Sequence, residues 1–185
     1  EQFALTDAER ETLQEACLAH VAARVPVIVT CSHFCTRIAP PDRPSVYEML
    51  SEVHPLLSAV TVRHPLDSFI SLQAEAWIHF SPPTLDEYSL RYGMFLDRHQ
   101  GLPVLQYEDF VRDPAAELTK LCQILNLPFN PAVLDLFPIV RVSGDSGRSG
   151  AQIAPRPRRP VPGEIERQRT GEAYRSLCRR MGYEP

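Results

Sequence analysis

Arg63 and Ser71 are the residue pair whose types and spacing best fit phosphate binding. Arg63 directly follows an apolar, β-branched run and precedes Pro65, which suits the first turn of a helix. A helix that begins where a buried strand ends presents backbone N–H groups to an anion, and an arginine fork can hold a phosphate bidentately. Ser71, eight positions after Arg63, could add a hydroxyl. The alternative is an ordinary strand-to-helix junction with a surface arginine.

A candidate general base follows another apolar run. His33 lies just past Val27–Cys31, and histidine is the side chain best suited to proton transfer near neutral pH. The alternative is a histidine that only makes a hydrogen bond within its loop. The other histidines have no partner motif, so we interpret them as structural or surface residues; they are His20, His54, His64, His79 and His99.

Cys31 and Arg37 have the Cys-x5-Arg spacing of a cysteine-dependent phosphatase. In that chemistry the thiolate attacks phosphorus while the arginine and the loop N–H groups hold the oxygens. This loop lacks the glycines that would let it wrap around an oxyanion, and Pro40 and Pro41 block the helix that should follow. We keep the phosphatase as a minor alternative.

The elements that would position these residues alternate in type. Short apolar runs at 27–31, 57–62 and 104–106 indicate buried strands, and helical patterns lie between them. This order predicts an α/β fold, a parallel β-sheet flanked by helices, in a single domain over 1–185. Ligands of such sheets bind beyond the carboxyl ends of the strands, which is where His33 and Arg63 would lie.

Capping signals and apolar spacing define the expected helices. Thr84 and Asp113 precede helical patterns as N-caps, and Pro114 fits the first helical position. Apolar residues at helical spacing predict core faces after Pro65 (Phe69, Leu72, Ala76 and Phe80) and after Pro114 (Leu118, Leu121, Cys122 and Leu125). We expect helices near 6–24, 45–53, 65–80, 84–99, 114–125, 131–137 and 163–182.

A second motif lies downstream of the phosphate-binding pair. The strand 104–106 leads into Tyr107-Glu108-Asp109, and a leucine-rich helix follows. We interpret Glu108 and Asp109 as capping and ion-pair residues, because adjacent helical positions do not face each other. The two motifs, in this order and at this distance, resemble those of sulfotransferases that use 3′-phosphoadenosine 5′-phosphosulfate (PAPS). Together they cover about half of the chain.

The resemblance implies a fold, a reaction and a set of residues. The fold would be the P-loop-kinase-like sulfotransferase architecture. The reaction would transfer a sulfuryl group from PAPS to a hydroxyl or amine of a small-molecule, glycan or lipid acceptor, leaving 3′-phosphoadenosine 5′-phosphate (PAP). Arg63 and Ser71 would bind the 3′-phosphate, Tyr107 would border the adenine, and His33 would be the general base.

The same resemblance extends to a loop near the C-terminus. Segment 143–150 is rich in glycine and serine, and successive N–H groups in such a loop can form an anion nest. By similarity, Ser143 and Arg148 would contact the 3′-phosphate, although their spacing departs from the family pattern. The alternative is a surface loop. The prolines and arginines that follow predict irregular structure over 140–162.

One departure from the family pattern concerns the loop that cradles the phosphosulfate. No glycine-, serine- and threonine-rich turn precedes Thr6, and no G-x-x-x-x-G-K-[ST] occurs in the chain. We expect that an N-terminal segment is missing, so the fold is incomplete at its start, and that activity is negligible without it. The alternatives are a non-catalytic nucleotide-binding domain derived from a sulfotransferase, and a nucleotide kinase, which would need the absent P-loop lysine.

Composition excludes several other classes of protein. The net charge of −4 gives no sign of a nucleic-acid-binding protein, and no run of 18 apolar residues predicts a membrane span. The five cysteines fit no disulfide framework, so we expect a reducing, cytoplasmic compartment. No cluster of ligand residues predicts a metal site.

Overall fold

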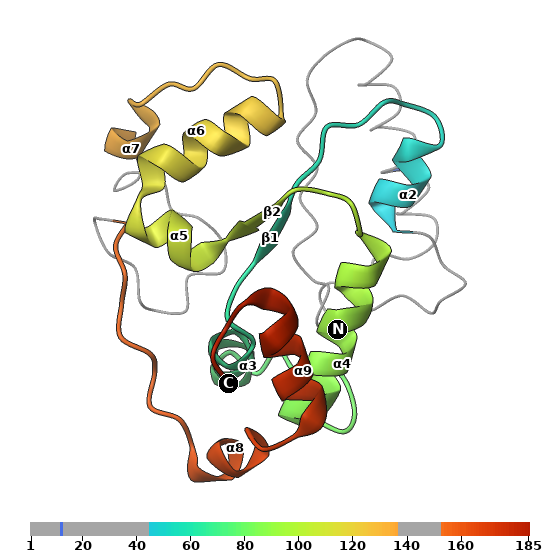
Figure 1. Cartoon of the computed structure of the whole chain (residues 1–185), viewed down its shortest axis with the longest axis vertical. Coiled ribbons are helices and arrows are strands. Elements are labelled where there is room, and N and C mark those ends of the chain that lie inside the picture. The colour runs from blue at the N-terminus through green and yellow to red at the C-terminus, as the bar shows by residue number, and fades with distance from the viewer. Residues whose placement is uncertain (1–11, 13–44, 137–152) are drawn as a thin grey trace. The chain divides into compact units, whose positions relative to one another are not determined.

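The computed structural model describes residues 12, 45–136 and 153–185, and the structural statements below concern these residues alone (Figure 1). The chain divides into two compact units, Glu1–Ser32 and His33–Pro185. Only Thr12 is described in the first unit, so the architecture below is that of the second. The expected helix near 6–24, the strand near 27–31 and the Cys-x5-Arg segment lie outside the described residues.

Two parallel strands form the sheet of the described residues. β1 (Val60–Val62) pairs with β2 (Val104–Gln106), with Val60 opposite Val104 and Val62 opposite Gln106 (Figure 1). The chain between them passes through the helices α3 (Pro65–Ala74) and α4 (Leu85–Arg98), since parallel strands need a crossover connection. The predicted α/β class and the parallel order of these two strands are confirmed.

The first strand is shorter than predicted. It begins at Val60, whose N–H donates to the Pro103 carbonyl at 2.8 Å, and β2 begins one residue later. The residues before Val60 therefore extend beyond the first residue of β2 and are not part of the strand pair. Leu57, predicted to open the buried strand, is 60% exposed.

The helix α3 is also shorter than its apolar spacing indicates. Ala76 has a φ of 54°, and the Trp77 N–H donates to the Leu72 carbonyl at 2.9 Å, which closes the helix end in a Schellman-type turn. Phe80 is buried but lies in the loop beyond this turn. The prediction that Ala76 and Phe80 belong to the apolar face of this helix was wrong. The four-residue spacing of apolar residues continues beyond the helix end, and no glycine marks that end in the sequence.

The other predicted caps are confirmed. The Thr84 hydroxyl accepts from the Glu87 N–H at 3.3 Å, and the Asp113 carboxylate accepts from the Ala116 N–H at 3.0 Å. The remaining helices of the described part are α2 (Val46–Ser51), α5 (Tyr107–Arg112), α6 (Pro114–Ile124), α7 (Val133–Leu136), α8 (Gly163–Gln168) and α9 (Glu172–Met181).

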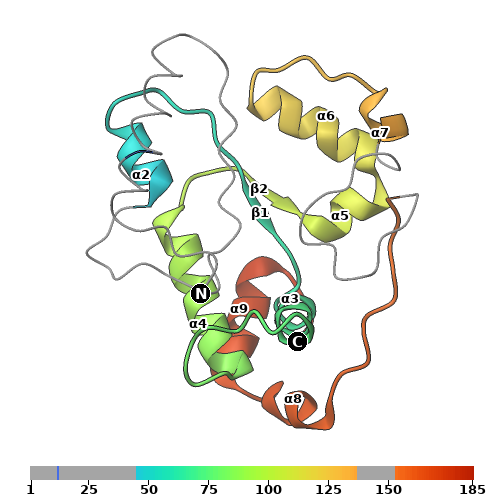
Figure 2. The ribbon, with the colours of Figure 1, turned by 180° about the vertical axis from the view of Figure 1, so that it is seen from behind.

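The hydrophobic core lies where α3, α4 and α9 pack together beside β1 (Figures 1 and 2). Aromatic rings fill much of it: Tyr88 packs against Phe69 and Tyr92, with centroid distances of 5.6 and 5.7 Å. Each such ring removes a large apolar area from water, so these contacts dominate the stability of the unit. The other buried members are Val60, Val62, Leu66, Ile70, Phe80, Leu85, Ile165, Tyr174, Leu177 and Cys178.

The helix α6 does not contribute to this core. Its leucine-rich face, predicted as a core face, is only half-buried, and no residue of α6 is buried. The helix packs chiefly on α5, its neighbour in the chain. The prediction was wrong because apolar spacing shows which face of a helix is apolar, not how completely other elements cover it.

The predicted single helix over 163–182 is instead two helices, α8 and α9. A side chain of α4 caps α9, and a side chain at the end of α8 caps α4. The Asp86 carboxylate of α4 accepts from the Tyr174 N–H of α9 at 3.1 Å. In return the Gln168 side-chain oxygen at the end of α8 accepts from the Leu85 N–H at 2.7 Å. The break falls at Gly171, where an added Cβ would lie 2.1 Å from the Asp86 carboxylate oxygen.

Gly171→Ala is therefore expected to destabilise the fold by roughly 1–3 kcal/mol, the usual cost of overpacking, because Asp86 must withdraw and leave α9 without its cap. Urea unfolding followed by far-UV circular dichroism measures this effect. Gly93→Ala is the matched control. Gly93 lies inside α4 with open space around an added Cβ, so this change should stabilise the chain by about 1 kcal/mol. Equal midpoints for the two variants would contradict the capping role of Asp86.

Candidate functional site

The candidate site lies at the carboxyl ends of β1 and β2. The two strands end in register at Val62 and Gln106, so the next residues, Arg63 and Tyr107, are neighbours across the sheet. The Arg63 guanidinium carbon lies 4.8 Å from the centroid of the Tyr107 ring, a cation–π contact. Two residues that the family resemblance predicts to bind a nucleotide, from motifs more than forty positions apart, are thus in direct contact.

The Arg63–Tyr107 pair is open to solvent and carries uncompensated positive charge. The Tyr107 side chain is 42% exposed although it opens α5, and Arg63 is partly exposed. Within the part of the chain that the structure describes, no carboxylate forms an ion pair with Arg63, whereas Arg91, Arg98 and Arg158 each have one. An arginine held by an aromatic ring keeps the N–H donors at the edge of its plane for an anion.

The backbone of Arg63 is fixed by a buried tyrosine of α4. The Tyr92 hydroxyl accepts from the Arg63 N–H at 2.9 Å and donates to the Arg63 carbonyl at 3.1 Å. Because Tyr92 is almost fully buried in the core, the position of the Arg63 backbone is tied to the core packing. Sequence reasoning missed this role; the only signal is the spacing of Tyr88 and Tyr92, which indicates one buried helix face.

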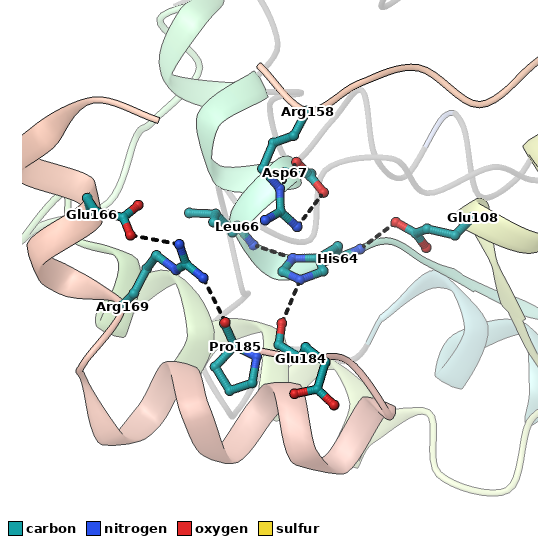
Figure 3. A network of polar contacts seen from close by, with 9 residues as sticks. All are labelled: His64, Leu66, Asp67, Glu108, Arg158, Glu166, Arg169, Glu184 and Pro185. Atoms are coloured by element: carbon teal, nitrogen blue, oxygen red, sulfur yellow. Dashed lines mark hydrogen bonds and ion pairs between the residues drawn. The ribbon is translucent and has the colours of Figure 1, made fainter. Parts of the chain in front are cut away.

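His64 is structural, as predicted, and caps α3 (Figure 3). Its Nδ1 accepts from the Leu66 N–H at 3.2 Å, so the ring proton is on Nε2, which donates to the Glu184 carbonyl at 3.0 Å. The ring is buried and packs 5.0 Å from that of Tyr183. Since His64 already satisfies the Leu66 N–H, an anion at this helix end must rely on Arg63 more than on the backbone expected from the sequence.

Glu108 joins three segments of the chain (Figure 3 shows its contact with His64). One carboxylate oxygen accepts from the His64 backbone N–H at 3.0 Å, and the other accepts from the Tyr183 hydroxyl at 2.6 Å. Burial, followed by the bond to Glu108, raises the pKa of Tyr183, so the phenol keeps its proton and remains a donor. Asp109, the adjacent residue, pairs with Arg112 at 2.7 Å, as the sequence predicts.

The buried position of His64 has a consequence for stability against pH. Desolvation is the main cause that lowers the pKa of His64, and the Arg158 charge adds to it; the bond to Glu184 and the charges of Asp67 and Glu108 oppose it. Because the folded-state pKa lies below the unfolded-state value, the unfolded chain binds the proton more tightly. The contribution of His64 is therefore lost as the pH falls below about 6.5.

We expect His64→Asn to flatten this part of the stability–pH profile. Asparagine can still accept from the Leu66 N–H as an N-cap but does not titrate. Urea unfolding at several pH values between 7.5 and 5 measures the two slopes, and the slope rather than the absolute stability is the readout. Parallel profiles for the wild type and the variant would show that another group causes the acid sensitivity.

Ser71 lies two turns into α3 and is half-buried. It is four positions from Asp67, which forms an ion pair with Arg158 at 2.8 Å (Figure 3). In the described part of the chain no hydrogen bond joins Ser71 to Arg63 or Tyr107, and its place in the site stays a prediction. The other predicted site residues, His33, Ser143 and Arg148, lie outside the described residues.

Arg158 is the member of the basic C-terminal segment that the structure brings to α3. Residues 153–162 contain no helix or strand, as predicted for this part of 140–162. Arg158 nevertheless reaches the first turn of the helix and neutralises Asp67 there. The sequence indicated a basic segment but gave no sign of this partner, because the two residues are ninety-one positions apart.

A cavity of about 310 Å³ lies elsewhere, on the sheet face covered by the ends of α4 and α9. Neither Arg63 nor Tyr107 lines it. Among the described residues, no group of three or more histidine, cysteine or acidic side chains could hold a metal ion. No helix of the described part combines the length and the apolar character that a membrane crossing requires.

Comparisons with known proteins give one short match. No family model matches the chain, and no solved structure matches it. The chain is 60% identical over 38 residues to L-2-keto-3-deoxyarabonate dehydratase of Azospirillum brasilense, which is 20% of this chain and 12% of that protein. A match of this length shows neither a family nor a shared activity.

Proposed function

We propose that this chain is the nucleotide-binding part of a PAPS-dependent sulfotransferase with a P-loop-kinase-like fold. The observation that carries the proposal is the stacked pair Arg63–Tyr107 at the ends of two parallel strands that are joined in register. Both residues come from the two motifs that resemble this family. Their contact supports the interpretation that the motifs form one site.

The chemistry of the pair suits an adenine nucleotide that carries a 3′-phosphate. The guanidinium supplies a charged fork for phosphate oxygens, and the tyrosine ring supplies a flat apolar surface for a purine. In this proposal Arg63 and Ser71 hold the 3′-phosphate, Tyr107 borders the adenine, and Ser143 and Arg148 close the site from the distal loop. His33 is the general base for the acceptor.

The proposed enzyme acts in the cytoplasm on a small-molecule, glycan or lipid acceptor. Calorimetric titration of the full chain with PAP tests the nucleotide site, with adenosine 5′-monophosphate, which lacks the 3′-phosphate, as the control ligand. Radiolabelled PAPS offered with a phenol, a sugar alcohol and a lipid alcohol tests transfer. Tight binding of PAP with transfer to any acceptor supports the proposal. Equal affinity for the two nucleotides contradicts it, and binding without any transfer by the complete gene product favours a non-catalytic nucleotide-binding domain.

A further inference from the structure

We propose that Glu108 and Tyr183 are positioning residues that hold Arg63 and Tyr107 at their stacking distance and so set the affinity for the nucleotide. Neither residue touches the proposed ligand position; each acts through its neighbour in the network. The link to affinity depends on the proposed function, whereas the positioning role can be tested without a ligand.

The first argument is the place of Glu108 in the sheet. The backbone ladder between β1 and β2 ends at Val62 and Gln106. One residue further, Arg63 and Tyr107 are joined only by their side chains. Two residues further, the Glu108 carboxylate accepts from the His64 N–H at 3.0 Å. This hydrogen bond links the two segments once more beyond the ends of the strands, where α3 and α5 begin to diverge. It therefore limits how far Arg63 and Tyr107 can separate.

Residues at and just after the end of α9 also hold Glu108 and β2 in place. The Tyr183 hydroxyl donates to the other Glu108 oxygen at 2.6 Å, and the Gln106 side-chain amide donates to the Met181 carbonyl at 3.1 Å. The last residue of α9 therefore contacts the last residue of β2, and Tyr183, just after α9, contacts the start of α5. A carboxylate whose two oxygens accept from two fixed donors has one preferred orientation, which fixes the first turn of α5 and the direction of the Tyr107 ring.

Both oxygens of Glu108 are used within the protein. Tyr183 remains a phenol because burial and Glu108 raise its pKa. A carboxylate with a protein donor on each oxygen is held in one orientation. The geometry therefore suits orientation of the neighbouring residues.

Two variants of the full chain test the proposal, and a third is their control. Tyr183→Phe removes only the hydroxyl, and Glu108→Gln removes the charge while it keeps the size of the side chain. Asp109→Asn changes the adjacent carboxylate of α5, whose partner is the exposed Arg112. Thermal unfolding of each variant checks that it folds; if Glu108→Gln does not, Tyr183→Phe alone decides.

The first readout needs no ligand. The ring current of Tyr107 should shift the δ-methylene protons of Arg63, and a two-dimensional ¹³C–¹H spectrum compared with that of Tyr107→Leu measures this shift. Tyr183→Phe and Glu108→Gln should lose a large part of the shift, and Asp109→Asn should keep it. A full shift in both test variants would overturn the positioning role, because the pair would then stay stacked without the network.

The second readout is the affinity for PAP by calorimetry. The two test variants should bind PAP about tenfold more weakly, the scale of one charged hydrogen bond, and Asp109→Asn should bind it normally. In Arg63→Ala the added Tyr183→Phe change should have a much smaller effect than in the wild type, since one of the two residues that it positions is gone. Fully additive losses would contradict the proposal. If the wild type does not bind PAP, the proposed function is wrong, and the ring-current readout still decides whether Glu108 and Tyr183 hold the pair.

Discussion

Arg63→Ala is expected to weaken the binding of PAP by roughly 1.5–3 kcal/mol, or about ten- to a hundredfold. The guanidinium is the charged donor at the strand ends, and among the described residues no carboxylate neutralises it. The His64 ring already accepts from the Leu66 N–H, the first N–H group of α3, so this group cannot replace the lost charge of the guanidinium. Calorimetric titration of the full chain with PAP, at fixed ionic strength, gives the difference directly.

Two further variants separate the role of the Arg63 fork from that of charge alone. Arg63→Lys keeps the charge but loses the planar fork, so we expect an affinity between those of the wild type and Arg63→Ala. Arg112→Ala removes an exposed arginine of α5 that already pairs with Asp109, and it should bind PAP normally. If Arg63→Ala binds as tightly as the wild type, Arg63 is a surface residue of an ordinary strand-to-helix junction.

The elements that the sequence predicts well are those with local causes. Strand β2, the start of α4 at Thr84 and the start of α6 at Asp113 and Pro114 agree with the structure. In each case the deciding interaction lies within about one helical turn, where the identity of a cap or a proline determines the backbone. The two motifs also named Arg63 and Tyr107 as site residues; their contact with each other was not predicted, and their roles stay predictions.

The elements that the sequence predicts poorly depend on partners far along the chain. Gly171 breaks the last helix because Asp86, eighty-five positions earlier, fills the space beside it. Ala76 ends α3 in a conformation that alanine seldom adopts, so no composition signal marks the end. The partners of His64, Glu108 and Arg158 are likewise set by tertiary packing. Residue spacing within one segment cannot predict such contacts.

His33→Ala is expected to lower the rate of sulfuryl transfer from PAPS by about 10²–10⁴-fold, the usual contribution of a general base. His33 lies outside the described residues, and its role is predicted from the sequence. Histidine is the side chain whose proton affinity suits base catalysis near neutral pH, and His33 follows an apolar run as Arg63 does. Single-turnover measurements on the complete gene product, with PAPS and a reactive phenol acceptor, give the transfer rate apart from product release.

A comparison of His33→Ala with Arg63→Ala tests whether His33 acts in sulfuryl transfer and Arg63 in nucleotide binding. A base acts on the acceptor oxygen and contributes nothing to the 3′-phosphate, so His33→Ala should bind PAP as the wild type does. His99→Ala is a suitable control, because the Nδ1 of His99 is bonded to the Phe95 carbonyl on α4. A full transfer rate in His33→Ala would remove this residue from the mechanism. Weakened PAP binding with an unchanged maximal rate would make His33 a nucleotide ligand.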